Sequence, residues 1–198
     1  MFLSGVIEML NRLNLPLSVL RLNVDFEQAV ISVARELLPN IQISGCFFHF
    51  AQANWRKVVD LGFRQRYVED DLFAGSCRLL TALAFVPLND VVDAFETVAS
   101  SMADEMAPLI TYYRQTYAGS YDRTSAFRDG KIVILRTYNQ PMFPPQYWSV
   151  YQRVLDGEPR TNNLIEGWHR RFQVIVNKSH PNIHEFMKRL KVLQESYN

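Results

Sequence analysis

Apolar residues recur at helical spacing along most of the chain and form short strand-like runs at only a few places. Helical spacing occupies 2–14 and 26–38, and each is followed by a short apolar run, at 18–24 and 41–45, that is typical of a buried strand. After this unit the strand pattern returns only at 131–135, as one arm of a strand or hairpin. Further helices are predicted at 49–60, 69–84, 88–104, 108–117, 146–156, 162–176 and 182–196.

The order strand, helix, strand near the start predicts two parallel strands joined by a crossover helix. A parallel pair with both faces covered is too small to be a stable sheet by itself, so we expect additional strands from elsewhere. The pattern therefore predicts a mainly α fold with a small α/β part.

Composition narrows the class of protein. A chain of 198 residues with 48% hydrophobic residues can bury a core, and its two cysteines are too few for a disulfide scaffold. Two cysteines fit a reducing, intracellular compartment, nuclear or cytoplasmic, and no apolar run approaches the ~20 residues of a membrane span. We therefore expect no membrane partner.

Charge is unevenly distributed along the chain. Residues 66–108 contain two Lys or Arg against eight Asp or Glu, whereas residues 109–198 contain thirteen against seven. A basic C-terminal half favours a surface that faces a polyanion, although ordinary solvated faces give the same pattern.

Asp25 directly follows the first predicted strand. The carboxyl ends of parallel strands are where open α/β sheets place ligands and catalytic groups. The alternative is an N-cap for a helix that begins at Phe26, with Gln28 at the third helical position of a capping box.

Cys46 and His49 leave the second predicted strand three residues apart. A thiol and an imidazole at this spacing can form half of a zinc site, and His180 and His184 offer a second pair. About 130 residues separate the two pairs, and a cysteine is often simply buried, so zinc is not the expected cofactor.

The stretch 160–170 combines an apolar stripe with a polar face that carries Glu166, His169 and Arg170. One carboxylate among amide, imidazole and guanidinium groups can bind a metal or a phosphate. The alternative is a surface helix with a Glu166–Arg170 pair at i,i+4 spacing.

Taken in order, these motifs resemble the Mutator-like (MULE) transposase domain across roughly residues 10–192. The matching segments are Asn23-Val-Asp25-Phe-Glu27, Ser44-Gly-Cys46-Phe-Phe-His49, Ala82-Leu-Ala-Phe-Val-Pro87, Thr116-Tyr-Ala-Gly119, Trp148-Ser-Val-Tyr151 and Arg160 to His169. The resemblance implies a partial ribonuclease-H-like core formed by 1–49 and 158–198, interrupted by an all-helical insertion at 50–157.

The same resemblance implies the residues of the site. Asp25 and Glu166 match the second and third carboxylates of a DDE triad that binds Mg²⁺ or Mn²⁺ for phosphoryl transfer on DNA. Cys46 and His49 match the family's C-x2-H signature, and Trp168 and His169 follow the glutamate, as structural support. The basic residues expected to bind DNA are Arg160, Arg170, Arg171, Lys178, Lys188 and Arg189.

The family's first aspartate has no counterpart in 2–15, so the resemblance implies a copy truncated at its N-terminus. Because two carboxylates leave both metal ions short of ligands, we expect DNA transposition chemistry to be absent from this chain alone. The alternative function is a non-catalytic DNA- or protein-binding module of a domesticated transposon protein. Expected partners are DNA, in the form of transposon ends, and a second copy of the chain, since an exposed strand edge favours self-association.

Overall fold

The computed structural model describes residues 2–12, 21–161, 167, 170, 174 and 182–195. The chain divides into two compact units, Met1–Arg160 and Thr161–Asn198. In the described part of the second unit, α11 (Ile183–Glu195) matches the predicted helix at 182–196. None of the described helices is both long and apolar enough to cross a membrane.

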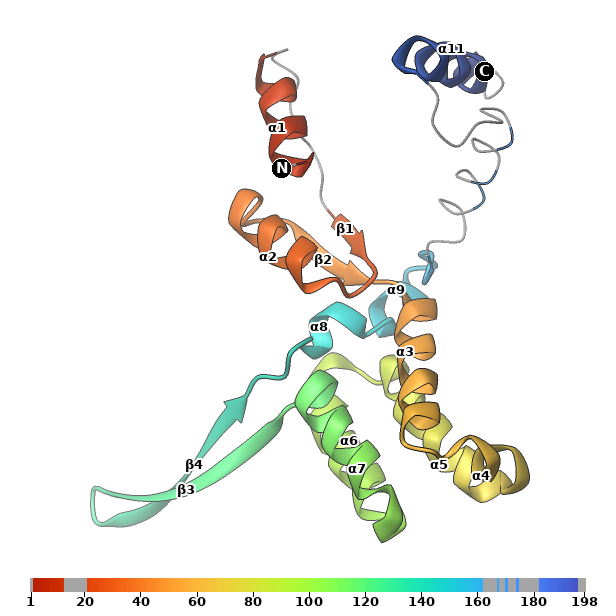
Figure 1. Ribbon diagram of the computed structural model, residues 1–198. Helices are drawn as coiled ribbons and strands as arrows, with labels where there is room; N and C mark the ends of the chain where they lie inside the picture. Colours follow the sequence, from red (N-terminus) through yellow and green to blue (C-terminus); the bar gives the residue numbers. More distant parts are fainter. Residues whose placement is uncertain are drawn as a thin grey trace. The chain divides into compact units, whose positions relative to one another are not determined.

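The first unit is mainly helical, and its described residues also form one parallel and one antiparallel strand pair (Figure 1). The predicted class, mainly α with a small α/β part, is thereby confirmed. Its elements in chain order are α1 (Phe2–Arg12), β1 (Arg21–Val24), α2 (Gln28–Leu37), β2 (Gln42–Gly45), α3 (Phe47–Asp60), α4 (Arg64–Glu69), α5 (Asp71–Ala82), η1 (Leu83–Phe85), η2 (Leu88–Asp90), α6 (Val91–Ser100), η3 (Asp104–Met106), α7 (Ala107–Tyr113), the π-helical turn η4 (Arg114–Ala118), β3 (Ser120–Arg128), β4 (Lys131–Asn139), α8 (Pro145–Trp148) and α9 (Tyr151–Leu155).

The strand–helix–strand unit near the start forms as the apolar pattern predicts. β1 and β2 pair in parallel, with Val24 opposite Gly45. Val24 and Ile43 are buried, and Ile31 of α2 joins the same core, because these apolar positions all face away from water. The pair is extended by no further strand among the described residues.

An aromatic cluster forms the centre of the first unit. The Phe50 ring of α3 stacks on the Trp148 ring of α8 with centroids 5.0 Å apart and planes 6° apart. Trp148 is fully buried, and its indole N–H donates to the carbonyls of Tyr117 and Phe143, each at 3.1 Å. The indole thus ties the turn after α7 to the segment that follows β4.

The described helices differ from the predicted ones in their bounds and in how they are divided. The helix expected at 146–156 is interrupted between α8 and α9, where Ser149 is extended and the Val150 N–H donates to the Ala84 carbonyl at 2.8 Å. α4 was not predicted, and α5 begins only after Asp70, whose carboxylate accepts from the Leu72 and Phe73 N–H groups at 3.0 Å. The backbone hydrogen bond from Phe73 is the main cause that lowers the pKa of Asp70.

The described residues of 1–160 share one hydrophobic core, which contains Val24 and Ile43 as well as Phe50, Phe95 and Trp148. The boundary expected at residue 50 falls within α3. The division into a ribonuclease-H-like core and an inserted helical segment stays a prediction.

One charged side chain belongs to this interior. Arg153 of α9 is only 6% exposed, and its Nη2 donates to the Gly45 carbonyl at 2.8 Å, while its Nε has no hydrogen-bond partner among the residues that the structure describes. Burial lowers the pKa of Arg153, and nearby Arg21 acts in the same direction. Arg153 therefore attaches α9 directly to the end of β2.

Candidate metal centre

The carboxyl ends of β1 and β2 bring together the first predicted site residues. Asp25 follows Val24 of β1 and Cys46 follows Gly45 of β2, and the two strands are in register at these last positions. The Cys46 N–H donates to the Val24 carbonyl at 3.0 Å. Parallel pairing thus places both side chains at one edge of the pair, as the sequence predicts.

The start of α3 adds His49 to this edge. Cys46 is the extended N-cap residue of α3, and His49 lies in the first helical turn. One ligand atom from each of Asp25, Cys46 and His49 lies within 4.8 Å of the other two. Cys46 is buried, His49 is half-buried and Asp25 is exposed, so the group opens to solvent on the carboxylate side.

The imidazole approaches the carboxylate without forming an aligned hydrogen bond. His49 Nδ1 lies 2.9 Å from Asp25 Oδ1, yet this buried ring nitrogen has no hydrogen-bond partner of good geometry. The imidazole therefore lies within ion-pair distance of the Asp25 carboxylate.

Phe26 sets the direction in which Asp25 leaves β1. Its φ of 65° lies in the left-handed region, which is unusual for a bulky residue and costs free energy. Its ring covers Gly45 and makes edge contacts with Phe143, at 5.3 Å between centroids, and with Tyr117, at 6.4 Å. The aromatic contacts therefore hold the backbone turn directly after Asp25.

The N-cap interpretation of Asp25 is wrong. α2 begins at Gln28, its N-cap residue is Glu27, and Glu27 makes no side-chain capping hydrogen bond. The left-handed Phe26 separates Asp25 from the helix. The carboxylate instead lies beside His49.

The three donor atoms suit two kinds of cation. Thiolate and imidazole ligands favour zinc, whose tetrahedral ligand atoms lie about 3.3–3.8 Å apart, so a zinc ion would require small adjustments of ligand atoms that here lie within 4.8 Å of one another. Mg²⁺ and Mn²⁺ prefer oxygen, and only Asp25 supplies it here. For a hard cation, Asp25 is the ligand, while Cys46 and His49 support its position.

Of the other predicted site residues that the structure describes, Arg160 lies beside this edge, and the rest belong to the second unit. Arg160 places its guanidinium over the Phe85 ring at 5.8 Å, and its carbonyl accepts from the Phe47 N–H at 3.0 Å. Arg189 pairs with Glu185 within α11 at 3.0 Å. Three further predicted residues, Arg170, Lys188 and His184, are exposed. The predictions for Glu166, Trp168, His169, Arg171, Lys178 and His180 lie outside the described residues.

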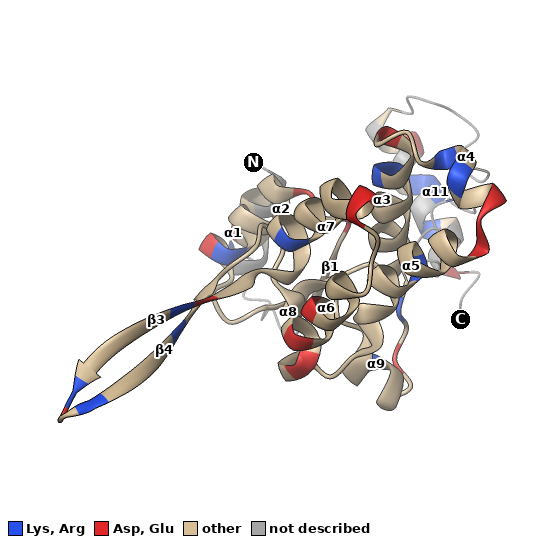
Figure 2. Ribbon diagram, turned by 90° about the horizontal axis from the view of Figure 1, so that it is seen from below, with Lys and Arg blue, Asp and Glu red and all other residues tan. Residues whose placement is uncertain are grey.

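Sequence reasoning missed one exposed feature, the hairpin formed by β3 and β4. It expected only a short strand at 131–135, whereas both arms contain nine residues. The dipeptide Asp129-Gly130 between two strand-like runs was the available signal, because both residues have positive φ, 50° and 77°, as a type I′ turn requires. The hairpin extends away from the helices of the first unit (Figure 2).

No protein-family model, no curated protein and no solved structure matches the chain. The interpretation of the site therefore depends on the motifs and on the geometry given above.

Proposed function

We propose that the chain is a domain derived from a DDE-type transposase, in which the carboxyl edge of β1 and β2 binds a divalent cation but the chain alone is inactive on DNA. The observation that carries the proposal is the convergence of Asp25 with Cys46 and His49 at that edge, with ligand atoms within 4.8 Å. The order of motifs along the sequence supports the same family. The residue after β1, Asp25, and a residue of α3, His49, are separated in the sequence and yet belong to the same group of ligand atoms.

The roles of the residues follow from their donor atoms. Asp25 supplies the carboxylate oxygen that a hard divalent ion prefers. Glu166, which lies outside the described residues, is the second carboxylate that the resemblance implies. Cys46 and His49 hold the end of β2 and the start of α3 against Asp25. A bound divalent ion would activate the attacking oxygen and stabilise the leaving one.

The proposal also predicts that the 198-residue chain cleaves no DNA. The DDE mechanism uses three carboxylates, and the resemblance finds two of them, Asp25 and Glu166, in this sequence. Incubation with Mg²⁺ or Mn²⁺ and nicked DNA tests this. Cleavage that disappears in an Asp25→Ala, Glu166→Ala variant would show that another carboxylate completes the site.

Metal binding is the direct test of the site. We expect Mn²⁺ binding, measured by calorimetry, to be lost in Asp25→Asn and retained in Cys46→Ser. Glu27→Gln is the matched control, because it removes the same charge two residues away on an exposed side chain. Stoichiometric Zn²⁺ that is lost equally in Asp25→Asn, Cys46→Ser and His49→Gln, with no Mn²⁺ binding, would contradict the proposal and assign a zinc centre.

A further inference from the structure

The hairpin β3–β4 belongs to the first unit. It is long and regular, and it is joined to the rest of that unit at one end only. Its arms pair antiparallel from Ser120 opposite Asn139 to Arg128 opposite Lys131. At the attached end, the Tyr138 hydroxyl donates to the Ala118 carbonyl at 2.9 Å, and Tyr138 packs on Tyr121 at 5.2 Å. Nine residues per arm give a length of about 30 Å.

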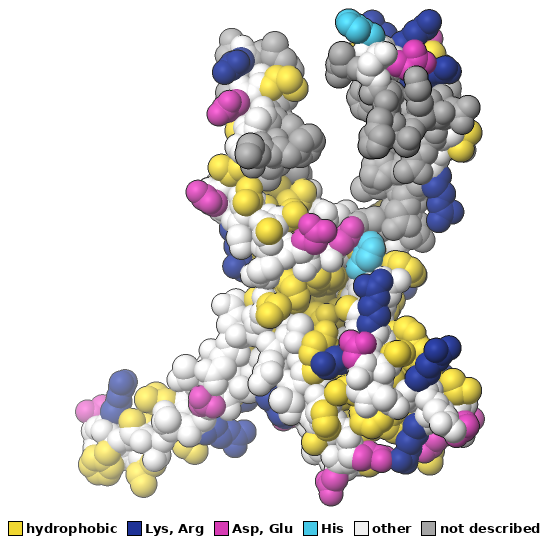
Figure 3. Space-filling model, viewed as in Figure 1, with side chains coloured by type: hydrophobic (Ala, Val, Ile, Leu, Met, Phe, Trp, Pro, Cys, Tyr) yellow, Lys and Arg dark blue, Asp and Glu magenta, His cyan; other side chains and the backbone are white. Residues whose placement is uncertain are grey.

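One face of the hairpin exposes apolar side chains toward its free end. Phe127 and Ile132 face each other across the strands and are 75% and 73% exposed, and Ile134 beside them is 65% exposed. Hydrophobic side chains gather at the free end in the space-filling view (Figure 3). A solitary two-stranded hairpin is marginally stable in water, so an exposed apolar face of this kind favours a covering partner.

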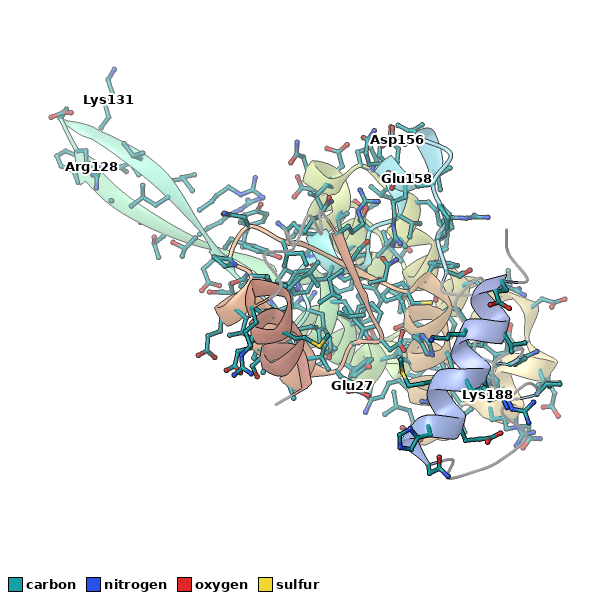
Figure 4. All side chains as sticks on the ribbon, turned by 90° about the horizontal axis from the view of Figure 1, so that it is seen from above. Glu27, Arg128, Lys131, Asp156, Glu158 and Lys188 are labelled. Carbon is teal, nitrogen blue, oxygen red and sulfur yellow. The ribbon has the colours of Figure 1, made fainter. Side chains whose placement is uncertain are left out.

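Cations lie on both faces of the hairpin: Arg123 is on the face of Phe127 and Ile132, whereas Arg128 and Lys131 flank the turn on the other face. Arg123, Arg128 and Lys131 make no ion pair within the part of the chain that the structure describes. Arg128 and Lys131 stand at the free end, remote from the helices (Figure 4). Across the hairpin as a whole, residues 120–139 contain four Lys or Arg against two Asp.

Arg123 and Arg136 face each other directly in the register. Like charges at such positions destabilise a hairpin unless an anion lies between or beside them. Arg136 is partly compensated by Asp93 at 3.3 Å and by the Tyr121 ring at 4.3 Å, whereas Arg123 is not. A second copy of this face would add further arginines, so charge complementarity favours a polyanionic partner.

We propose that β3–β4 is a DNA-binding arm, which sets the face of Arg123 and the Phe127–Ile132 pair against duplex DNA, while Arg128 and Lys131, on either side of the turn, reach backbone phosphates at the edge of the groove. A two-stranded ribbon fits the major groove, which is about 12 Å wide, and ~30 Å corresponds to nearly one turn of the duplex. In the major groove, apolar side chains contact the methyl groups of thymine bases. The inference does not depend on the metal site of the proposed function.

Fluorescence anisotropy with a labelled random duplex of about 30 base pairs, in EDTA, tests the arm over about 50–200 mM salt. We expect Arg128→Ala, Lys131→Ala to reduce the slope of log affinity against log salt by about 1.8, because each lost phosphate contact removes about 0.9. Arg56→Ala, Arg64→Ala is the matched control, since both arginines are exposed and lie outside the hairpin. The control should leave the slope within about 0.5 of the wild type.

The apolar pair has a separate signature. Phe127→Ser, Ile132→Ser should weaken binding about tenfold while leaving the salt slope unchanged, because contacts to bases release no counterions. Circular dichroism should show an unchanged melting temperature, since both side chains are exposed and lie outside the core.

Three outcomes would contradict the proposal that β3–β4 is a DNA-binding arm. One is an equal change of slope in the hairpin and control variants, and another is tight binding that no hairpin variant weakens. The third is a dimer, measured by sedimentation, that Phe127→Ser, Ile132→Ser converts to monomer without altering DNA affinity. Asp25→Asn should bind this duplex in EDTA like the wild type. The experiment therefore distinguishes an error in the proposed metal site from an error in the proposed DNA-binding arm.

Discussion

Replacing Gly45 by alanine should disturb the packing that holds the candidate site in place. A methyl group at Gly45 would overlap the Phe26 ring, approaching Cε1 to 2.8 Å and Cε2 to 2.9 Å. The ring has little room to move, because Phe143 lies against its other side with centroids 5.3 Å apart and Phe26 is already in the left-handed region. Overpacking of this kind typically costs 1–3 kcal/mol, so we expect a loss of about 2 kcal/mol in the free energy of unfolding.

A double-mutant cycle isolates the cause. Phe26→Ala removes the ring and should cost about 2 kcal/mol on its own, since Phe26 is half-buried. In that background Gly45→Ala should cost less than about 0.5 kcal/mol, because the methyl group occupies the space that the ring has left. The expected coupling energy is therefore about 1.5 kcal/mol, within the range found for residues in contact.

Urea unfolding followed by circular dichroism measures each free energy, and a constant m-value would show that the denatured state is unchanged. Gly75→Ala in α5 is the matched control, because its added methyl group meets no atom within 4 Å. This control should be neutral or stabilise by up to about 1 kcal/mol. Additive effects of Gly45→Ala and Phe26→Ala, within about 0.5 kcal/mol, would refute the reasoning.

Two further predictions concern the core and pH. Trp148→Phe should lower the free energy of unfolding in urea by about 3 kcal/mol. The smaller ring leaves a cavity, and the buried carbonyls of Tyr117 and Phe143 lose their hydrogen-bond donor. A loss below about 0.5 kcal/mol would contradict this role of Trp148. Asp70→Ala should lower the melting temperature at neutral pH. The capping carboxylate has a lowered pKa, so its stabilisation is complete above the ordinary value of 3.8 and disappears as pH falls through the folded value; a difference in melting temperature that persists unchanged at pH about 2 would argue against the cap.

The sequence predicted the parts of this fold in which local pattern and tertiary packing agree. Val24 and Ile43 lie in short apolar runs that occur at strands, and the order of elements implied their parallel pairing. The position of Cys46 at the end of β2 followed from the same pattern. For these residues, the conformation that the local sequence favours is also the one that tertiary packing requires.

Prediction failed where a distant contact decides the backbone. A capping pattern at Asp25 favoured a helix from Phe26, but the Phe26 ring packs against Phe143, which is far along the chain, and this contact holds the left-handed turn. β3 has a polar sequence with little alternation, and it becomes a strand because β4 pairs with it across the turn. Local propensity carries no information on either partner.

The hydrogen bond from Arg153 to Gly45 has a consequence for the order of folding. It joins residues 108 positions apart, and the stacked rings of Phe50 and Trp148 span nearly as many. Closing such long loops is slow, and a chain grows from the ribosome at about 5–20 residues per second. The strands that precede Asp25 and Cys46 therefore remain without their packing partners for several seconds, with their apolar side chains exposed, until α8 and α9 have been synthesised. Chaperone binding to nascent chains should be strongest in that interval and should end once Arg153 has left the exit tunnel.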